Sequence, residues 1–527
     1  MAAAARRSRD FIVTRTQRFL GGLSLGYLNT AVVMVVALWL TPYLLRHLGD
    51  HEYGLWLLGA QVLVYLALMD LGVVALLPRE VAYATGRAGG DRSHELPQLV
   101  GETARLVLWQ TPAVALAAFV TWHLVPSSWG SLQWPLALVV LAFVVLFPFR
   151  LFQAVLQGLQ DLPFLGAAQL GAWAVGTSVT VMLVFARWGL YALAVGWIAT
   201  QGLTVLIFQW RLRRRFADAV PDQLPKLSST RARIQLGKGA WVSVSQVAQV
   251  LLNGTDIMIV GKLLGPSAVV PFVCTGKLIS LLANQPNLLI QMAGPALSEL
   301  RTGAVRERLF TVSTALNQAM LLGSGAVVCV VLAVNHGFVR WWVGGERFGG
   351  NVLTVLMLLS MLLRHLNLTA VYTLFAFGHE RRLAITGVAD GCVTVFASSI
   401  LVHVFGAPGA VLGSIVGVTL VSLPSNMTAL AREDGVSLIE MMRVLYPWFW
   451  RFCLLAMVAM GFSVLWVPTT FWLLALVGLT AASIYALAMV PLLAQPPLAN
   501  YVIPRLAPIL GKWSRRFRHP VVGESVS

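Results

Sequence analysis

The chain has 527 residues, of which 58% are hydrophobic and only 11% are charged. Soluble domains carry about 25% charged residues, so this composition predicts an integral membrane protein and excludes an ordinary soluble domain. The formal net charge of +17 would favour a nucleic-acid partner in a soluble chain. Here the basic residues gather on connections between apolar segments, as the positive-inside rule expects for cytoplasmic loops, so no nucleic-acid partner is expected.

Apolar segments of spanning length begin after a basic N-terminal stretch. Residues 1–18 contain five arginines and are predicted to remain in the cytoplasm. No short apolar region with a small-residue cleavage site follows them, so we expect no cleaved signal peptide. The segment 19–210 is then interpreted as a first lobe of six spans, each with about 20 mostly apolar residues.

The densest basic block separates this first lobe from a second one. Residues 211–236 form a predicted cytoplasmic linker, 237–430 a second lobe of six spans, 431–493 two further spans, and 494–527 a basic cytoplasmic tail. The predicted fold class is an all-α integral membrane protein with about 14 transmembrane helices. The predicted spans are 19–44, 53–77, 101–124, 134–156, 163–186, 189–210, 237–261, 268–292, 309–334, 352–377, 382–405, 409–430, 445–467 and 470–493.

The two lobes repeat each other faintly. The run from Leu44 to Gly49 returns as Val260 to Gly265, 216 positions later, and Pro78 corresponds to Pro295 at nearly the same offset. Four further positions return about 220 residues later: Gly158, Gly171, Phe185 and Gly189, as Gly378, Gly391, Phe405 and Gly409. Two pseudo-symmetric lobes of even span number are typical of alternating-access transporters, whose substrate site lies between the halves. The repeat therefore predicts a protein that moves a substrate across a membrane.

The sequence offers little for catalysis. The longest predicted outer loop, 335–350, has about sixteen residues, whereas a membrane glycosyltransferase or polymerase needs a sizeable extramembrane loop for its acid/base groups. No Walker loop and no HExxH motif occur. The four cysteines lie singly inside apolar segments without metal-ligand spacing. We therefore expect no enzymatic activity, no metal and no cofactor.

Several segments, taken together and in order, resemble a known family of transporters. They are Leu40 to Gly49, Glu52 to Trp56, Asp70 to Gly72, Arg79 to Ala82, Leu156 to Asp161, Trp241 to Gly265 and Pro295 to Arg301. They resemble corresponding segments of the polysaccharide flippases of O-antigen type. This family belongs to the MOP exporter superfamily, which also contains the lipid II flippases and the MATE drug exporters.

The resemblance implies a fold, a cargo and a location. The fold would be MATE-like, with two six-helix lobes around a central cavity and two extra C-terminal helices. The cargo would be a polyprenyl-diphosphate-linked oligosaccharide, flipped to the outer leaflet of a bacterial inner membrane for O-antigen, capsule or exopolysaccharide assembly, with both termini in the cytoplasm. Lipid II flippases have an arginine-rich first span, whereas span one here has no charge before Arg46. Peptidoglycan precursor is therefore the less favoured cargo.

Two basic residues are predicted to lie inside the membrane. Arg364 is about midway along span ten, and Lys277 is about ten residues into span eight. A charge near the bilayer centre is costly and tends to be kept for a function, and both side chains bind phosphate oxygens. We predict that Arg364 and Lys277 hold the lipid diphosphate. The alternative is that each pairs with a buried acid, Lys277 with Asp256.

Three acidic residues are candidates for ion coupling: Asp70 in span two, Asp256 in span seven and Asp390 in span eleven. An intramembrane carboxylate could take up a proton or Na⁺ and couple it to cargo release. Hydrogen bonding at helix ends and ion pairing are the alternatives, since Arg79 follows Asp70 closely and the arginines at 381–382 precede Asp390.

Polar and basic residues outline a predicted cargo path. Gln249 and Asn253 share one helical face of span seven with Gln246 and Asp256, and we predict that this face lines the path of the sugar. Hydrogen bonding between helices is the alternative. At the cytoplasmic ends of spans three and four, Arg105 and Arg150 would meet an incoming anionic headgroup, unless they only reach towards the membrane interface.

Three rival functions follow from the same residues. A MATE-like drug or cation antiporter would share the fold, but the two extra helices and Arg364 argue against it. A membrane enzyme of polysaccharide synthesis would need functional residues in the outer loop 335–350. A scaffold for a synthesis complex without transport activity stays open as well.

Overall fold

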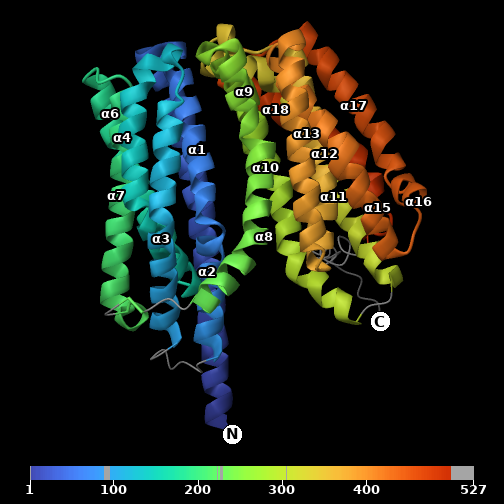
Figure 1. Cartoon of the computed structure of the whole chain (residues 1–527). Helices are drawn as coiled ribbons and strands as arrows, with labels where there is room; N and C mark the ends of the chain where they lie inside the picture. Colours follow the sequence, from blue (N-terminus) through green and yellow to red (C-terminus); the bar gives the residue numbers. More distant parts are fainter. Residues whose placement is uncertain (1, 88–94, 222–223, 226–228, 304–305, 500–527) are drawn as a thin grey trace, which may run out of the picture. The chain divides into compact units, whose positions relative to one another are not determined.

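The computed structural model describes residues 2–87, 95–221, 224–225, 229–303 and 306–499, and these are almost entirely helical (Figure 1). Within these ranges, side chains are described except at 2–31, 86–87, 95, 229–236, 238, 253, 288–303 and 306–309. The predicted basic tail at 494–527 lies mostly outside the described residues, as do the side chains of the N-terminal segment 1–18.

The helices follow one another with short connections. They are α1 (Ala2–Ala67), α2 (Val73–Arg87), α3 (Glu95–His123), α4 (Gly130–Leu146), α5 (Arg150–Gly158), α6 (Leu162–Phe185), α7 (Leu190–Arg215), α8 (Ser229–Asn253), α9 (Thr255–Leu264), α10 (Pro266–Gly303), α11 (Arg306–Trp342), α12 (Asn351–Ala376), α13 (Glu380–Phe405), α14 (Ala407–Gly417), α15 (Leu423–Asp434), α16 (Leu438–Arg443), α17 (Tyr446–Leu465) and α18 (Phe471–Leu493). Short turns lie between them: η1 (Leu68–Asp70), η2 (Ser127–Trp129), η3 (Phe147–Phe149), η4 (Ala217–Ala219), η5 (Gly345–Arg347) and the π-helical η6 (Val418–Ser422).

Twelve segments of the described chain are long and apolar enough to cross a membrane, or thirteen if α8 and α9 form one bent span. The protein is thus an all-helical, multi-pass membrane protein, as the composition predicts. The number differs from fourteen because the first segment, Val32–Asp70, contains parts of both predicted spans one and two. Its helical geometry is interrupted at Gly49, where the prediction places the turn between these spans.

The chain divides into two compact units. Unit 1 comprises Met1–Val273 and Gly387–Gly413, and unit 2 comprises Cys274–Thr386 and Ser414–Ser527. Span seven and most of span eleven therefore group with the first lobe. The predicted lobe and linker boundaries stay a prediction.

Two glycines form matching turns. Gly49 has φ 82° and ψ 168°, and Gly265, between α9 and α10, has φ 93° and ψ 160°. Side chains other than hydrogen disfavour this backbone region, so glycine permits the sharp turn at both places. Pro266 follows Gly265 at the first position of α10, where a missing N–H costs no helical hydrogen bond. These turns lie 216 residues apart, at corresponding positions of the predicted repeat.

In unit 1, α6 and α7 pack closely through small residues. A Cβ on Gly176 would overlap Thr200 Oγ1 and the Gly196 carbonyl oxygen, and a Cβ on Gly196 would overlap Thr180 Oγ1. Each threonine hydroxyl donates to the carbonyl oxygen of the glycine four residues earlier, at 2.9 Å. Small residues four apart let membrane helices approach closely where no hydrophobic force drives their association. The spacing on both helices therefore fixes their crossing.

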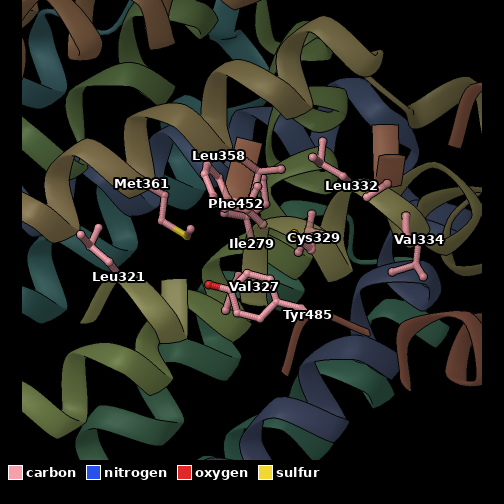
Figure 2. Close-up of a cluster of buried hydrophobic side chains, with 14 of the residues drawn as sticks. Ile279, Leu321, Val327, Cys329, Leu332, Val334, Leu358, Met361, Phe452 and Tyr485 are labelled. Carbon is pink, nitrogen blue, oxygen red and sulfur yellow. The ribbon is translucent and has the colours of Figure 1, made fainter. Parts of the chain in front are cut away.

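Unit 2 has an apolar core between α10, α11, α12, α17 and α18 (Figure 2). Trp448 stacks on Phe452 with ring centroids 4.7 Å apart, and its indole N–H donates to Tyr485 Oη at 3.0 Å. Opposite them, Gly325 of α11 leaves room for the Tyr485 hydroxyl and the Phe452 ring. The two C-terminal spans, α17 and α18, are thus packed firmly on α11.

Candidate functional site

Arg364 is a half-buried cation on α12 in unit 2. Its Nε and Nη2 donate to Ser414 Oγ at 2.9 and 2.8 Å, and Nη2 also donates to the Ser414 carbonyl oxygen at 3.3 Å. Ser360 Oγ, one turn before Arg364, lies 3.1 Å from the same hydroxyl. Neutral oxygens on the neighbouring segment therefore orient the guanidinium.

Irregular backbone follows Ser414 directly. The helix α14 passes into the π-helical turn η6 at Val418, one turn after Ser414. Such turns are rare and occur often at functional sites, because they redirect side chains and carbonyl groups. Beside Arg364, the buried His365 makes a 2.7 Å hydrogen bond between its Nδ1 and Ser324 Oγ of α11. Polar contacts thus join α11 and α12 to the segment at Ser414 around the middle of α12.

Lys277 lies half-buried on α10 in the same unit. The adjacent Gly276 faces Met357 of α12, whose sulfur would be 3.3 Å from a Cβ on that glycine. Met357 precedes Arg364 by seven residues, which is about 10 Å along a helix axis. The two predicted phosphate-binding cations thus lie on packed helices at different depths. Asp256 belongs to unit 1, so its predicted pairing with Lys277 stays a prediction.

Asp70 and Arg150, predicted separately, lie together in unit 1. Asp70 is only 2% exposed, and its Oδ2 lies 3.8 Å from Arg150 Nη2. The Gly72 N–H donates to Asp70 Oδ1 at 2.9 Å, and Arg150 Nη1 donates to the Ala67 carbonyl oxygen at 3.3 Å. Asp70 thereby joins the turn after η1 to the start of α5. Ion pairing was one alternative expected for Asp70 from the sequence, with Arg79 nearby. The structure shows an ion pair with Arg150.

Asp256 lies in the first turn of α9, directly after a break in predicted span seven. The helix α8 ends at Asn253, α9 begins at Thr255, and the two are bent by 43°. Glycine at position 254 favours such a break because it has low helix propensity. A carboxylate near a helix N-terminus is stabilised by the helix dipole. The break also interrupts the continuous polar face predicted from Gln246 to Asp256.

Asp390 is completely buried in unit 1, on α13. It accepts a hydrogen bond from Thr394 Oγ1 at 3.1 Å. The neighbouring Gly387 and Gly391 face Ala248 and Leu251 of α8, so this part of α13 packs against α8. Asp390 is the eleventh of 26 residues in α13, so it lies within the predicted span eleven.

The remaining predicted site residues have separate surroundings. Arg105 of α3 donates from Nη1 to the Pro225 carbonyl oxygen at 2.8 Å, which attaches the predicted linker to this helix. Gln249 of α8 is exposed. The side chain of Asn253 lies outside the described part of the structure. The structure therefore assigns Arg105 a linker contact and leaves Gln249 and Asn253 as predictions.

The structure adds polar residues that sequence reasoning did not select. Ser414 orients Arg364, and Asp434, a buried acid at the end of α15, bonds Ser313 of α11. Arg211 of α7 binds Asp161 through Nε at 2.8 Å and lies over the Phe164 ring. Asp434 could have been selected from the sequence, because it is an acidic residue close to the end of a predicted span. Ser414 carried no such signal, because isolated serines are common in membrane helices.

Residues 108–336 match the family model described as polysaccharide biosynthesis protein. This part of the chain is therefore similar to that family. No curated protein matches the chain. The family agrees with the resemblance expected from the sequence.

Solved structures show the fold. A lipid II flippase MurJ in an inward closed conformation is similar with a TM-score of 0.60 and 11% identity, over 89% of this chain and 100% of that one. An inward-facing multidrug resistance MATE transporter of the MOP superfamily has a TM-score of 0.54 and 14% identity, over 74% of this chain and 96% of that one. The MATE multidrug transporter DinF-BH, in complex with R6G, has a TM-score of 0.53 and 13% identity, over 80% of this chain and 95% of that one.

These matches establish the coarse predictions. The fold of the chain is similar to those of the lipid II flippase and the MATE transporters, as the resemblance implied. The solved structures that match are transporters, which agrees with the prediction that the chain is not an enzyme.

Proposed function

We propose that the protein flips a polyprenyl-diphosphate-linked oligosaccharide from the cytoplasmic to the outer leaflet by alternating access. The membrane would be a bacterial inner membrane, both termini would be cytoplasmic, and the product would serve O-antigen, capsule or exopolysaccharide assembly. The observation that carries this proposal is Arg364, a guanidinium oriented by Ser414 inside a membrane span. The match of residues 108–336 to the polysaccharide biosynthesis protein model supports it.

A membrane-embedded guanidinium suits a diphosphate. Arginine binds phosphate oxygens through two parallel N–H donors, and such charge-assisted bonds are about twice as strong as neutral ones. The cost of keeping the cation in the membrane is offset when it binds an anion there. Lys277, about two turns away in depth, would supply a second positive charge for the same group. Arg364 and Lys277 are therefore proposed as the diphosphate-binding residues.

The architecture of the proposal is fourteen spans in two six-helix lobes, with α17 and α18 outside the repeat. The matching backbone of Gly49 and Gly265, 216 residues apart, supports the repeat. In this architecture, Gly49 marks a turn between two spans. The segment Val32–Asp70 then crosses the membrane twice, although it is a single candidate span by length and composition. Gln249 and Asn253 of α8 would line the sugar path, and Arg105 and Arg150 would lie where the cargo enters.

An apolar groove in unit 2 supports a lipid-linked cargo. It lies between α11, α17 and α18 and has a volume of about 350 Å³. Its lining is Cys329, Ala333, Leu455, Val458, Ala459, Phe462, Trp466, Leu476, Val477, Thr480, Ala481, Ile484 and Tyr485. Only a threonine and a tyrosine contribute hydroxyl groups, so the groove suits a hydrocarbon chain better than a sugar. A polyprenyl tail would therefore have an apolar surface while its headgroup is moved.

Three buried or half-buried acids are proposed for ion coupling. Asp390 is completely buried on α13, Asp256 lies beside the break in span seven, and Asp70 forms an ion pair with Arg150. At Asp70, an incoming ion would compete with Arg150, whose Nη2 lies 3.8 Å from the carboxylate. A proton or Na⁺ would bind at Asp256 or Asp390 in exchange for cargo.

The drug antiporter is the second candidate, because two MATE transporters have TM-scores above 0.5 with this chain. The two MATE structures match 74% and 80% of the chain, whereas the lipid II flippase matches 89% of the chain and 100% of its own length. This wider match favours a cargo attached to a lipid.

Binding of a short-chain polyprenyl diphosphate to purified protein tests the proposal. We expect saturable binding by the wild type, none by Arg364→Ala, and unchanged binding by Arg340→Ala, which removes an exposed arginine of α11 in the same unit. Size-exclusion chromatography and thermal unfolding would establish that both variants are folded. Binding of organic cations, without binding of the diphosphate, would replace the proposal by the drug-antiporter function.

A further inference from the structure

A buried carboxylate marks the end of α15 in unit 2. Asp434 is the last residue of this helix, before Gly435 in the left-handed conformation, and is only 3% exposed. Its Oδ2 makes a 2.5 Å hydrogen bond with Ser313 Oγ of α11. Its Oδ1 is buried and has no hydrogen-bond partner among the described residues.

Three features of this position disfavour a negative charge. Burial removes water from the carboxylate, and a buried charge without a partner is costly. The C-terminus of a helix carries the negative end of its dipole, which repels an anion. Glu433 is the adjacent residue and adds a second carboxylate. A positive charge bound at Asp434 would relieve all three effects.

The charged groups described around Asp434 do not supply that positive charge. On the same helix, Arg432 is exposed, and Glu433 Oε1 is already bonded to His379 Nε2 at 2.7 Å. The helix α16 packs on α15 through Met441, in an apolar cluster with Leu430 and Ala431. On α11, the charged residues nearest to Ser313 lie at 306–308, whose side chains are outside the described part of the structure.

A second buried oxygen lies one turn further along α11. Asn317 is 3% exposed, and its Oδ1 also has no hydrogen-bond partner among the described residues. Ser313 and Asn317 are four residues apart and therefore lie on the same face of the helix. A bound ion is one of the few groups that can satisfy a buried polar atom without a protein partner. Here two such acceptor oxygens occur within one turn of the Ser313–Asp434 contact.

We propose that Asp434, Ser313 and Asn317 form a binding site for a hard monovalent cation such as Na⁺. Carboxylate, hydroxyl and amide oxygens are the ligands that hard cations take in proteins. The set carries a single negative charge, which matches a single positive charge. The ion joins the beginning of α11 to the end of α15 and stabilises this junction. The site is separate from Asp70, Asp256 and Asp390, and its occupancy requires no particular cargo.

Thermal unfolding of the purified full-length protein in detergent tests the site. NaCl would be titrated against choline chloride at constant ionic strength, with KCl as a parallel series. A ligand that binds the folded protein raises the unfolding midpoint in a saturable way. We expect this rise with Na⁺ in the wild type and in Glu433→Gln, which removes the adjacent carboxylate. We expect it to disappear in Asp434→Asn and to require about tenfold more Na⁺ in Asn317→Ala, the loss of about 1.4 kcal/mol.

The variants also distinguish this site from an ion bound elsewhere and from simple protonation. If Asp434→Asn fails to fold, binding of ²²Na⁺ to the wild type, Glu433→Gln and Asn317→Ala would test the site instead. We expect weaker ²²Na⁺ binding for Asn317→Ala alone. Equal midpoints in Na⁺, K⁺ and choline would overturn the proposal, as would a midpoint that depends on pH but not on Na⁺. A Na⁺ effect that persists in Asp434→Asn and is lost in Asp256→Asn or Asp390→Asn would overturn it too, because the ion would then bind in unit 1.

Discussion

At the scale of single residues, the contacts of Arg364 matter as much as its charge. Two of its nitrogens donate to one hydroxyl, Ser414 Oγ, and one also donates to the Ser414 carbonyl oxygen. A long side chain held in this way loses less conformational entropy when it binds an anion. Ser414 is therefore a positioning residue for the proposed diphosphate site.

Replacement of Ser414 by alanine tests this role. Without the hydroxyl, the guanidinium samples more orientations, and we expect the affinity for a short-chain polyprenyl diphosphate to fall about tenfold, or about 1.4 kcal/mol. Isothermal titration calorimetry would measure the change. Ser425→Ala is a matched control, since Ser425 accepts hydrogen bonds from the exposed Arg382 outside the proposed site. An unchanged affinity in Ser414→Ala would remove Ser414 from the site.

The Asp70–Arg150 pair allows a second prediction. Asp70 is 2% exposed and accepts the Gly72 N–H, whereas the Arg150 side chain is 35% exposed. Without the buried carboxylate, the Gly72 N–H has a weaker acceptor, which lowers the free energy of unfolding by about 1–3 kcal/mol. The arginine, by contrast, can be solvated by water. We expect Asp70→Asn to lower the unfolding midpoint in detergent more than Arg150→Gln does. The reverse order would show that the arginine is the essential partner.

At the scale of helices, close packing depends on where glycine occurs. Gly176 of α6 has no room for a Cβ, because Thr200 and Gly196 of α7 lie against it. A Cβ added to Gly171, on the same helix, would meet no other group within 4 Å. The same substitution should therefore have opposite effects at the two sites.

Thermal unfolding of Gly176→Ala and Gly171→Ala checks this expectation. Overpacking at Gly176 should destabilise the protein by about 1–3 kcal/mol. Alanine at position 171 should be neutral or stabilising by up to about 1 kcal/mol, because alanine has the higher helix propensity. Equal midpoints for the two variants would contradict the close α6–α7 packing.

At the scale of the whole molecule, the proposed function assigns the tail of the cargo to the apolar groove of unit 2 and the headgroup to Arg364 and Lys277. Ala481 of α18 lines the groove, and phenylalanine there would fill part of its volume of about 350 Å³. We expect Ala481→Phe to reduce transport of a carrier with a full-length polyprenyl tail in proteoliposomes. Binding of a short-chain diphosphate should stay unchanged, because the headgroup site is intact.

Leu479→Phe provides the control for this variant. Leu479 is 68% exposed on the same helix and does not line the groove. If both variants transported the long-tailed carrier as well as the wild type, the groove would not be the tail-binding surface. A loss of transport in Leu479→Phe as well would point to general damage of α18.

Much of the fold follows from local properties of the sequence. Apolar segments of about 20 residues predict membrane helices, because lipid leaves backbone groups no partner outside their own helix. The run from Leu44 to Gly49 and its counterpart ending at Gly265 predicted an internal repeat, and the two glycines have nearly the same φ and ψ. Apolar length and glycine chemistry act over a few residues, so they can be recognised without a structure.

The membrane class, the MATE-like fold and the presence of charged residues inside spans could all be predicted from the amino-acid sequence. The groups that those charges meet became visible only in the folded chain: Ser414 is 50 residues from Arg364, and Ser313 is 121 residues from Asp434. The fold also broke span seven at Gly254, where helical periodicity predicted one continuous polar face. Periodicity and composition describe a helix and its surroundings, whereas hydrogen bonds and ion pairs depend on which helices pack together and in what register.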